Sequence, residues 1–387
     1  MKIPIRYNLR SLWVRRVGTL MTALGIGLTV AILVAMMALI DGLDSTFVNT
    51  GYPNDLVVIR QGSQNETNSY LDRDIFPRVR FLPEVARDEN DEPWASGELI
   101  VVINHERIAG ENETSNIVIR GTGNRSFEMR PEVRIVEGRR FAKGVRELIV
   151  SRSLSRRFKS MELGDTLPIA QNEWTVVGIF DAGGTAYDSE IWGDYDEIAL
   201  AWTRPIYTSF LVRAKNGEAR AALAKRIEED RNIELQAIPQ TEYYEGQTIS
   251  SVGLKALGVF IAVVMGIGSC FAAMNMMYGT VMARFKEIGT LRALGFRRRS
   301  ILASFLAESV LLALLGGVAG CLMALPVHGI STGTTNFASF SEVLFHFRIT
   351  PEILFKAILF VSLVGIAGGL LPAARAARVR LIDVMRD

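Results

Sequence analysis

The stretch VGTLMTALGIGLTVAILVAMMALI, residues 17–40, contains no charged side chain. As an α-helix, these 24 residues extend about 36 Å, which exceeds the roughly 30 Å thickness of a bilayer's hydrocarbon core. Residues 256–283 and 357–374 are also free of charge, and residues 301–327 contain only Glu308. A soluble fold seldom contains four such runs. With the last run extended to 351, the sequence predicts four transmembrane helices, at residues 17–40, 256–283, 301–327 and 351–374.

Residues 1–16 carry five basic side chains and no acidic one. A cleaved signal peptide would also place basic residues before an apolar run, but this run is too long for one and Leu39-Ile40-Asp41 lacks a cleavage pattern. We expect the first helix to be retained. Ile5, Leu9 and Trp13 recur at helical spacing, so residues 1–16 are expected to form an amphipathic helix at the cytoplasmic interface; a frayed, solvated terminus is the alternative.

Charge sets the expected topology. Residues 284–299 carry six basic side chains against Glu287 alone, and the tail 375–387 is also basic. Basic segments stay on the cytoplasmic side, so both termini and the 284–300 segment are expected in the cytoplasm, with the chain crossing the membrane several times. Residues 41–255 hold 26 basic and 35 acidic side chains, a net charge of −9, which argues against nucleic-acid binding.

Residues 41–255 alternate short β-type runs, at 56–59, 99–103, 117–119, 148–150 and 174–180, with helical patterns at 75–85 and 217–231. Cys270 and Cys321 both lie in predicted spans, so this region is expected to have no disulfide. We expect a large mixed α/β extracytoplasmic domain inserted between helices 1 and 2. It forms either one domain or two lobes, with a β-rich insert at about 96–202 in a lobe made from both flanks. Residues 328–350 are expected to be a short outside loop.

Catalytic motifs are absent from the sequence: it has no GxxxxGK[ST] phosphate loop, no HExxH and no GxSxG. We therefore expect no enzyme activity and no cofactor or metal bound by the chain itself. The acidic side chains between 188 and 197 are expected to be solvated rather than to form a metal cluster. They are Asp188, Glu190, Asp194, Asp196 and Glu197.

The cytoplasmic segment ARFKEIGTLRALGFRRR, residues 283–299, is the most informative part of the chain. It predicts a short helix that ends at Gly295, where left-handed geometry is easiest. Its apolar residues recur every third position, between charges, at Phe285, Ile288, Leu291 and Leu294. Such a helix is either an ordinary interfacial loop or a ridge that inserts into a groove on a cytoplasmic partner.

Polar and small residues inside the predicted spans leave two alternatives open. Glu308 either contacts another helix, with Arg284 or Arg292 as its partner, or lies shallow enough to be wetted from the cytoplasm. Two GxxxG patterns permit close helix approach, either within the chain or at a seam between two copies. These patterns are Gly316–Gly320 and Gly365–Gly369.

The pattern Arg284-x-x-Glu287-Ile-Gly-x-Leu-Arg-Ala-Leu-Gly295 after a transmembrane helix resembles the FtsX-like permease domain, as does the ending around Pro372. Residues 41–255 are similar to the MacB-type periplasmic core in length, in placement and in Gly164-Asp165 and Val177-Gly178-Ile179. The chain thus resembles an ABC transporter permease of the FtsX-like/MacB-like family.

The resemblance implies a multi-pass protein of the bacterial inner membrane. It also implies a dimer, with a second copy or a related permease, bound to two cytoplasmic ATPase subunits that carry the ATP and magnesium. Sixteen residues precede the first span, so the ATPase is expected to be a separate protein. Membrane lipid and a periplasmic adaptor or outer-membrane protein are the other implied partners. The residues that correspond to the family's ATPase-coupling helix are Arg284, Glu287, Ile288, Gly289, Leu291, Arg292, Ala293, Leu294 and Gly295.

Two functions are compatible with these features. The first is a permease that couples ATP hydrolysis by its partner to movement of the extracytoplasmic domain, for export or extraction of a substrate at the outer face of the membrane. The alternative is a mechanical transmitter that transports nothing and activates an envelope enzyme or a signalling partner. The size of residues 41–255 favours the first.

Overall fold

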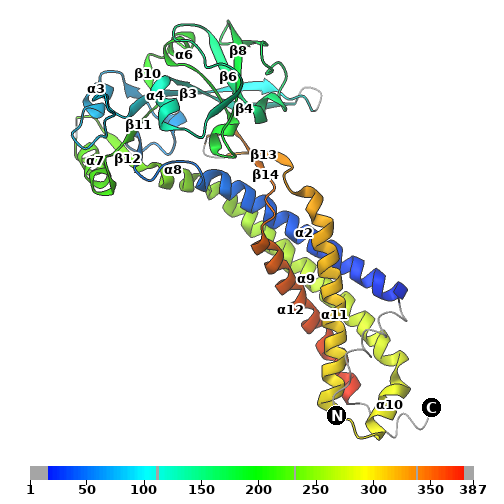
Figure 1. Ribbon diagram of the computed structural model, residues 1–387. Coiled ribbons are helices and arrows are strands. Elements are labelled where there is room, and N and C mark those ends of the chain that lie inside the picture. The colour runs from blue at the N-terminus through cyan, green and yellow to red at the C-terminus, as the bar shows by residue number, and fades with distance from the viewer. Residues whose placement is uncertain (1–15, 110–112, 231, 337–338, 379–387) are drawn as a thin grey trace. The chain divides into compact units, whose positions relative to one another are not determined.

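The computed structural model describes residues 16–109, 113–230, 232–336 and 339–378 (Figure 1). These form two compact units. The helical unit comprises the described residues up to Asp41, Gly253–Ile330 and those from Phe347 onward; the α/β unit comprises Gly42–Val252 and Ser331–His346. The amphipathic helix expected at residues 1–16 lies, apart from Arg16, outside the described residues.

Four helices of the described chain are long and apolar enough to cross a membrane, as predicted. Each is at least 27 residues long and contains an 18-residue stretch whose mean hydropathy exceeds 2. The helices associated with the helical unit are α2 (Arg16–Val48), α9 (Ile249–Ala283), α10 (Phe285–Ala293), α11 (Arg298–Ala324), η3 (Leu325–Val327) and α12 (Pro351–Ala377). The start of α12 is capped, because the Thr350 hydroxyl accepts a hydrogen bond from the backbone N–H of Ile353 at 3.3 Å.

Glycines let the long helices approach one another closely within a single chain. A Cβ atom added at Gly316 of α11 would lie 2.8 Å from the Ile26 Cβ of α2, and one at Gly320 would lie 2.7 Å from the Val30 Cβ. The glycines of α12 meet α11 in the same way, since a Cβ at Gly365 would lie 2.6 Å from the Ala313 Cβ and Gly369 abuts Ser309. All four glycines therefore pack helices of one chain, so a seam between copies is not needed to explain them.

The α/β unit is built on a ten-stranded sheet with the order β12-β1-β11-β3-β4-β9-β6-β8-β5, in which β7 also pairs with β8 (Figure 1). Its strands are β1 (Asp55–Arg60), β3 (Ala95–Glu106), β4 (Thr114–Thr122), β5 (Arg134–Gly138), β6 (Glu147–Ser151), β7 (Thr166–Ile169), β8 (Asn172–Asp181), β9 (Glu190–Asp194), β11 (Ser209–Arg213) and β12 (Leu235–Pro239). A separate pair joins β2 (Leu71–Asp72) to β10 (Ile206–Tyr207).

Short helices connect these strands. They are η1 (Glu66–Asn68), α3 (Ile75–Arg80), α4 (Asn124–Met129), α5 (Arg152–Ser155), η2 (Ala186–Ser189), α6 (Tyr195–Ala201), α7 (Gly217–Glu229) and α8 (Gln240–Gln247). The unit is thus mixed α/β, as predicted, with a helix at 217–229 and a shorter one than expected after Ile75.

Two hydrophobic clusters divide the α/β unit. One gathers buried residues from the two flanks, including Leu56, Phe210 and Leu223, and the other gathers residues that lie mainly between Leu99 and Ala199. One continuous sheet serves both clusters, because β11 of the flanks pairs with β3 of the insert. We call residues 95–202 the β-rich part.

Residues 331–346 differ from the loop that the sequence predicted. They include an antiparallel hairpin of β13 (Ser331–Thr335) and β14 (Glu342–His346) that belongs to the α/β unit. Val343, Leu344 and Phe345 of β14 are buried, and Leu344 joins the cluster of the β-rich part. The sequence hides this strand because its apolar run is only three residues long and follows a stretch rich in Ser, Thr and Gly.

Candidate coupling segment and buried ionic network

The predicted coupling residues lie on α10 and at its two ends. The apolar positions of this helix do not all face the same surroundings. Ile288 is 1% exposed and packs in a cluster with Val281, Ile301 and Phe305, whereas Leu294 is 67% exposed. The ridge predicted from three-residue spacing is therefore divided: Ile288 holds the helix against its own unit, and Leu294 remains accessible. Three-residue steps drift around a helix of 3.6 residues per turn, which explains the division.

The exposed side of α10 combines charge with apolar surface. Lys286, Glu287, Thr290 and Ala293 are exposed, while Leu291 and Arg292 are partly covered and Gly289 is buried. The helix is followed by Gly295, whose φ of +90° is a left-handed conformation that favours glycine. The arrangement leaves a short, well-anchored helix with a mixed accessible face.

Glu308 of α11 is paired with Arg284, which precedes α10. The Arg284 Nη1 donates to the Glu308 Oε2 at 3.0 Å, and the two side chains are 10% and 4% exposed. The sequence left two alternatives for Glu308: contact with another part of the helical unit, or exposure to water. The structure shows the first, with Arg284 as the partner. The pair links the start of the predicted coupling segment to α11.

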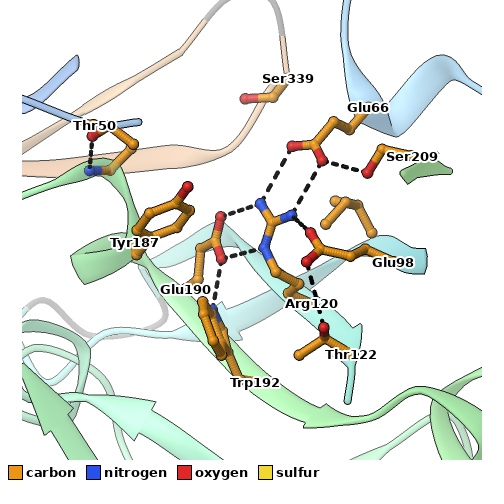
Figure 2. A network of polar contacts seen from close by, with 12 residues as sticks. Thr50, Glu66, Glu98, Arg120, Thr122, Tyr187, Glu190, Trp192, Ser209 and Ser339 are labelled. Carbon is orange, nitrogen blue, oxygen red and sulfur yellow. Dashed lines mark hydrogen bonds and ion pairs between the residues drawn. The ribbon is translucent and has the colours of Figure 1, made fainter. Parts of the chain in front are cut away.

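A second group of charges lies inside the α/β unit, centred on Arg120 of β4 (Figure 2). Its guanidinium is 2% exposed and binds three carboxylates, from Glu66 of η1, Glu98 of β3 and Glu190 of β9. The sheet explains the convergence. Arg120 lies opposite Ile100 on β3 and Trp192 on β9, and side chains two residues apart on a strand share a face, so Glu98 and Glu190 point to the same side as Arg120.

Arg130 completes the network by binding Glu98 at two points, 2.6 and 2.8 Å from its carboxylate oxygens. Burial by itself would raise the pKa of the Glu98 carboxyl, but the charges of Arg130 and Arg120 outweigh burial and lower this pKa to about 2. Burial likewise acts to lower the pKa of Arg120, yet its carboxylate partners raise that pKa well above the usual value. Glu98 and Arg120 therefore both stay ionised near neutral pH.

Aromatic side chains surround the ionic network. The Tyr187 ring lies 4.9 Å from the Arg130 guanidinium carbon, and burial raises the pKa of Tyr187 to about 12. Gln240, the first residue of α8, donates to the Tyr187 hydroxyl at 2.9 Å. The Tyr243 hydroxyl, also on α8, accepts a hydrogen bond from the Glu66 backbone N–H at 3.1 Å. The network thus joins the β-rich part to α8, which precedes α9 in the chain.

A cavity of about 70 Å³ adjoins this network and is lined in part by Glu66, Arg120, Glu190, Tyr243 and Glu342. Ligand pockets for drug-sized molecules usually measure about 300–1,000 Å³. This cavity is therefore suited to water rather than to an amphiphilic substrate.

The expectation that the acidic residues between 188 and 197 are solvated is wrong for three of the five, whereas Asp196 is exposed as expected. Asp188, Glu190 and Asp194 are between 4% and 7% exposed, so they are not solvated. Glu190 is neutralised by Arg120, and Asp188 accepts backbone hydrogen bonds from Ala182 and Gly184. Among the described residues, no group of three or more metal-ligating side chains is placed to hold a metal ion.

Sequence reasoning missed the Arg120 network altogether. Its members come from separate segments, and single charged residues within strands look like solvent-facing positions of an amphipathic sheet. The one available signal was Arg120 in the otherwise apolar run Ile117–Gly121, because a buried strand does not accommodate an unpaired charge.

Comparison with known proteins also divides the chain into an extracytoplasmic-type domain and a C-terminal permease domain. Residues 19–230 match the model of the MacB-like periplasmic core domain, and residues 259–381 match that of the FtsX-like permease C-terminal domain. The matched region is 25% identical over 410 residues to the macrolide export ATP-binding/permease protein MacB of Hahella chejuensis, covering 96% of this chain and 58% of that protein.

Two further proteins are similar to this chain. A pyoverdine export ATP-binding/permease protein, PvdT of Pseudomonas entomophila, is 27% identical over 399 residues, with 96% of this chain and 57% of that protein covered. The crystal structure of the periplasmic region of MacB from Actinobacillus actinomycetemcomitans aligns with a TM-score of 0.37 and 11% identity, over 51% of this chain and 92% of that chain.

The chain spans somewhat more than half the length of the two curated relatives. The periplasmic core model alone covers more than half of the chain, and the permease model follows it in the order expected from the sequence. The resemblance inferred from the Glu-Ile-Gly segment is therefore confirmed, and the chain belongs to the MacB/FtsX family of ABC transporter permeases.

Proposed function

We propose that this chain is the permease subunit of an ABC transporter in which a separate cytoplasmic ATPase drives movement of the α/β unit, for export or extraction of a substrate at the outer face of the membrane. The observation that carries this proposal is α10, a short helix between two candidate spans that is anchored on one side and accessible on the other.

Two contacts make α10 suitable for receiving force. Ile288 is buried in a cluster with residues of α9, α11 and α12, and the Arg284–Glu308 pair ties the start of the segment to α11. Force applied to Glu287, Thr290 or Leu294 would therefore move the long helices rather than bend a loop, because packed side chains transmit strain. We propose this exposed face as the ATPase-docking surface.

ATP and magnesium would be bound by the partner. The sequence contains no GxxxxGK[ST] loop to cradle nucleotide phosphates, whereas the two relatives above are named as ATP-binding as well as permease proteins. We propose two ATPase subunits for a dimer of permeases, composed of two copies of this chain or of this chain and a relative. Membrane lipid would surround the four candidate spans.

The charge distribution supports an arrangement with both termini and α10 in the cytoplasm and the α/β unit outside. A periplasmic adaptor or outer-membrane protein would then bind the α/β unit. The names of the relatives, which describe macrolide export and pyoverdine export, favour export over a purely mechanical transmitter.

The experiment that tests this proposal combines labelling with capture. In a variant with Cys270→Ser and Cys321→Ser, cysteines replacing the exposed Lys143 and Arg297 are treated in intact cells with an impermeant maleimide that can reach the periplasm. We expect labelling of position 143 alone, and co-purification of an ATPase with the tagged chain. Labelling at position 297, or capture of no ATPase after mild solubilisation, would contradict the proposal.

A further inference from the structure

The β13–β14 hairpin lies between two candidate spans in the chain and yet is built into the α/β unit. We propose that this hairpin is a mechanical tie through which α11 and α12 act on the β-rich part, with Glu342 as the clasp that holds it in place. The mechanical role rests on the proposed function, whereas the clasp can be tested without it.

The length of the connection is the first reason. Helices in a bundle are usually joined by about 2–8 residues, whereas residues 325–350 separate α11 from α12 here. Much of that additional length forms η3 and the hairpin. Only three residues separate Val327 from Ser331, and four separate His346 from Pro351, so the hairpin follows its helices with little slack.

Glu342 provides the second reason, because it binds two arginines of the β-rich part. Arg107, which follows β3, lies 2.7 Å from one carboxylate oxygen, and Arg157, shortly after α5, lies 3.2 Å from the other. The Glu342 side chain is 1% exposed, whereas those of the arginines are 29% and 23% exposed. A buried carboxylate is stable only when cations compensate its charge. Removing the two arginines would leave the Glu342 charge uncompensated, and removing Glu342 would leave the arginines without their shared anion.

Further contacts hold the hairpin along its length. The Asn116 side chain donates to the Phe340 carbonyl at 2.8 Å, and the Leu344 backbone N–H donates to the Ser189 hydroxyl at 2.8 Å. Asn336 donates to the side chain of Gln247, the last residue of α8, at 3.0 Å. The hairpin therefore contacts both the β-rich part and the segment that leads into α9.

These contacts give the α/β unit more than its two obvious connections to the candidate spans. If the α/β unit were connected to the spans only through α2 and through α8–α9, only movements of α2 and α9 would reach it. With the hairpin docked and its links short, a displacement of α11 or α12 must also be transmitted to the β-rich part through Arg107 and Arg157. A loop that merely joined two helices would need neither the ion pairs nor the buried Leu344.

The clasp is tested first, in full-length protein lacking Cys270 and Cys321. Val343 is 6% exposed, so a cysteine that replaces it should react slowly with maleimide while the hairpin is docked. Adding Glu342→Ala should speed this reaction at least about tenfold, the change expected when roughly 1.4 kcal/mol of docking free energy is lost. Glu113→Ala is the control, because Glu113 lies 4.0 Å from Arg107 and is largely exposed. Unchanged reactivity in the Glu342→Ala variant would refute the clasp.

The mechanical role is tested by adding slack. A Gly-Ser-Gly-Ser insertion after Gly329 and another after Arg348 lengthen both links, and the same insertion after the exposed Gly62 is the control. A spin label at position 143 reports movement of the β-rich part when ATP is added to the permease with its co-purified ATPase. We expect loss of the ATP-dependent spectral change in the slack variant, with ATPase capture retained. In a parallel preparation without the spin label, a cysteine at position 343 should stay protected.

A slack variant that captures the ATPase and retains the full spectral change would overturn the tie. If instead the unmodified chain captures no ATPase, the proposed function fails, and the maleimide reactivity at position 343 still decides whether Glu342 is the clasp.

Discussion

Arg120 on β4 and Glu190 on β9 form a two-point ion pair: the Nε and Nη2 atoms of the arginine each lie 2.7 Å from a different carboxylate oxygen. Both side chains are less than one-tenth exposed. Since the same guanidinium also binds Glu66 from η1 and Glu98 from β3, a single residue joins a flanking segment of the α/β unit to its β-rich part (Figure 2).

Replacing Arg120 by Met should strongly destabilise the α/β unit. The substitution leaves Glu66 and Glu190 without their cation, and breaking a buried ion pair from one side costs about 3–5 kcal/mol. For a domain of this size that loss lowers the melting temperature by roughly 6–20 °C. The melting temperature can be measured by heating the full-length protein stepwise and following its resistance to a protease. Arg60→Met, which removes a pair whose side chains are 53% and 66% exposed, should change little; equal melting temperatures for the two variants would contradict the role of Arg120.

Glu98 should make the α/β unit sensitive to acid. Its pKa in the folded protein is lowered to about 2, so the ionised form stabilises the fold. That contribution is fully present above the unfolded pKa, about 4.3, and is lost as pH falls towards 2. The loss in free energy of unfolding caused by Glu98→Gln should therefore be largest near pH 7. This loss should become smaller as the pH falls below about 4.5. Melting curves from neutral pH down to about pH 2.5 measure the difference; one that stays constant over this range would exclude a lowered pKa at Glu98.

Arg284 and Glu308 should be coupled energetically. Arg284→Met leaves a carboxylate that is 4% exposed without this partner, whereas Arg284→Met combined with Glu308→Leu removes both charges. We expect the single variant to be less stable in detergent than the double variant, because the cost of a broken buried pair is mainly that of the remaining charge. A double variant that loses as much stability as the sum of the two single variants would show that the residues act independently.

The sequence alone is enough to predict the four apolar helices, because a soluble fold rarely contains several charge-free runs of this length. It also predicts β1, β3, β4, β6 and β8, whose apolar runs are bounded by turn residues. In the helical unit, Arg284 could be named as a partner of Glu308 because an isolated carboxylate in an apolar helix requires one.

The remaining features depend on contacts between distant segments. Arg120 and Glu66 are 54 residues apart, and Glu342 is 235 residues from Arg107, so no local pattern brings either pair together. Ile288 illustrates a different limit: periodicity identifies the apolar positions of α10, but not which of them the neighbouring helices cover. The orientation of the protein in its membrane and its ATPase partner stay predictions.

The docking surface on α10 is the central claim. Leu294 is 67% exposed at the end of this short helix, and Glu287 in its first turn is also exposed. Replacing them by Leu294→Asp and Glu287→Arg should leave folding intact, since exposed substitutions usually change stability by less than about 0.5 kcal/mol. Ile288→Ala, by contrast, should cost about 2–4 kcal/mol of stability because its side chain is buried.

The decisive measurement is the affinity of the purified ATPase for full-length permease in lipid nanodiscs. The Leu294→Asp, Glu287→Arg variant should bind at least about a hundredfold more weakly, which corresponds to roughly 2.7 kcal/mol. Leu200→Asp is the matched control, because Leu200 on α6 of the α/β unit is also 67% exposed, and this variant should bind like the unmodified chain. An α10 variant that binds with undiminished affinity would contradict the assignment of α10 as the coupling surface.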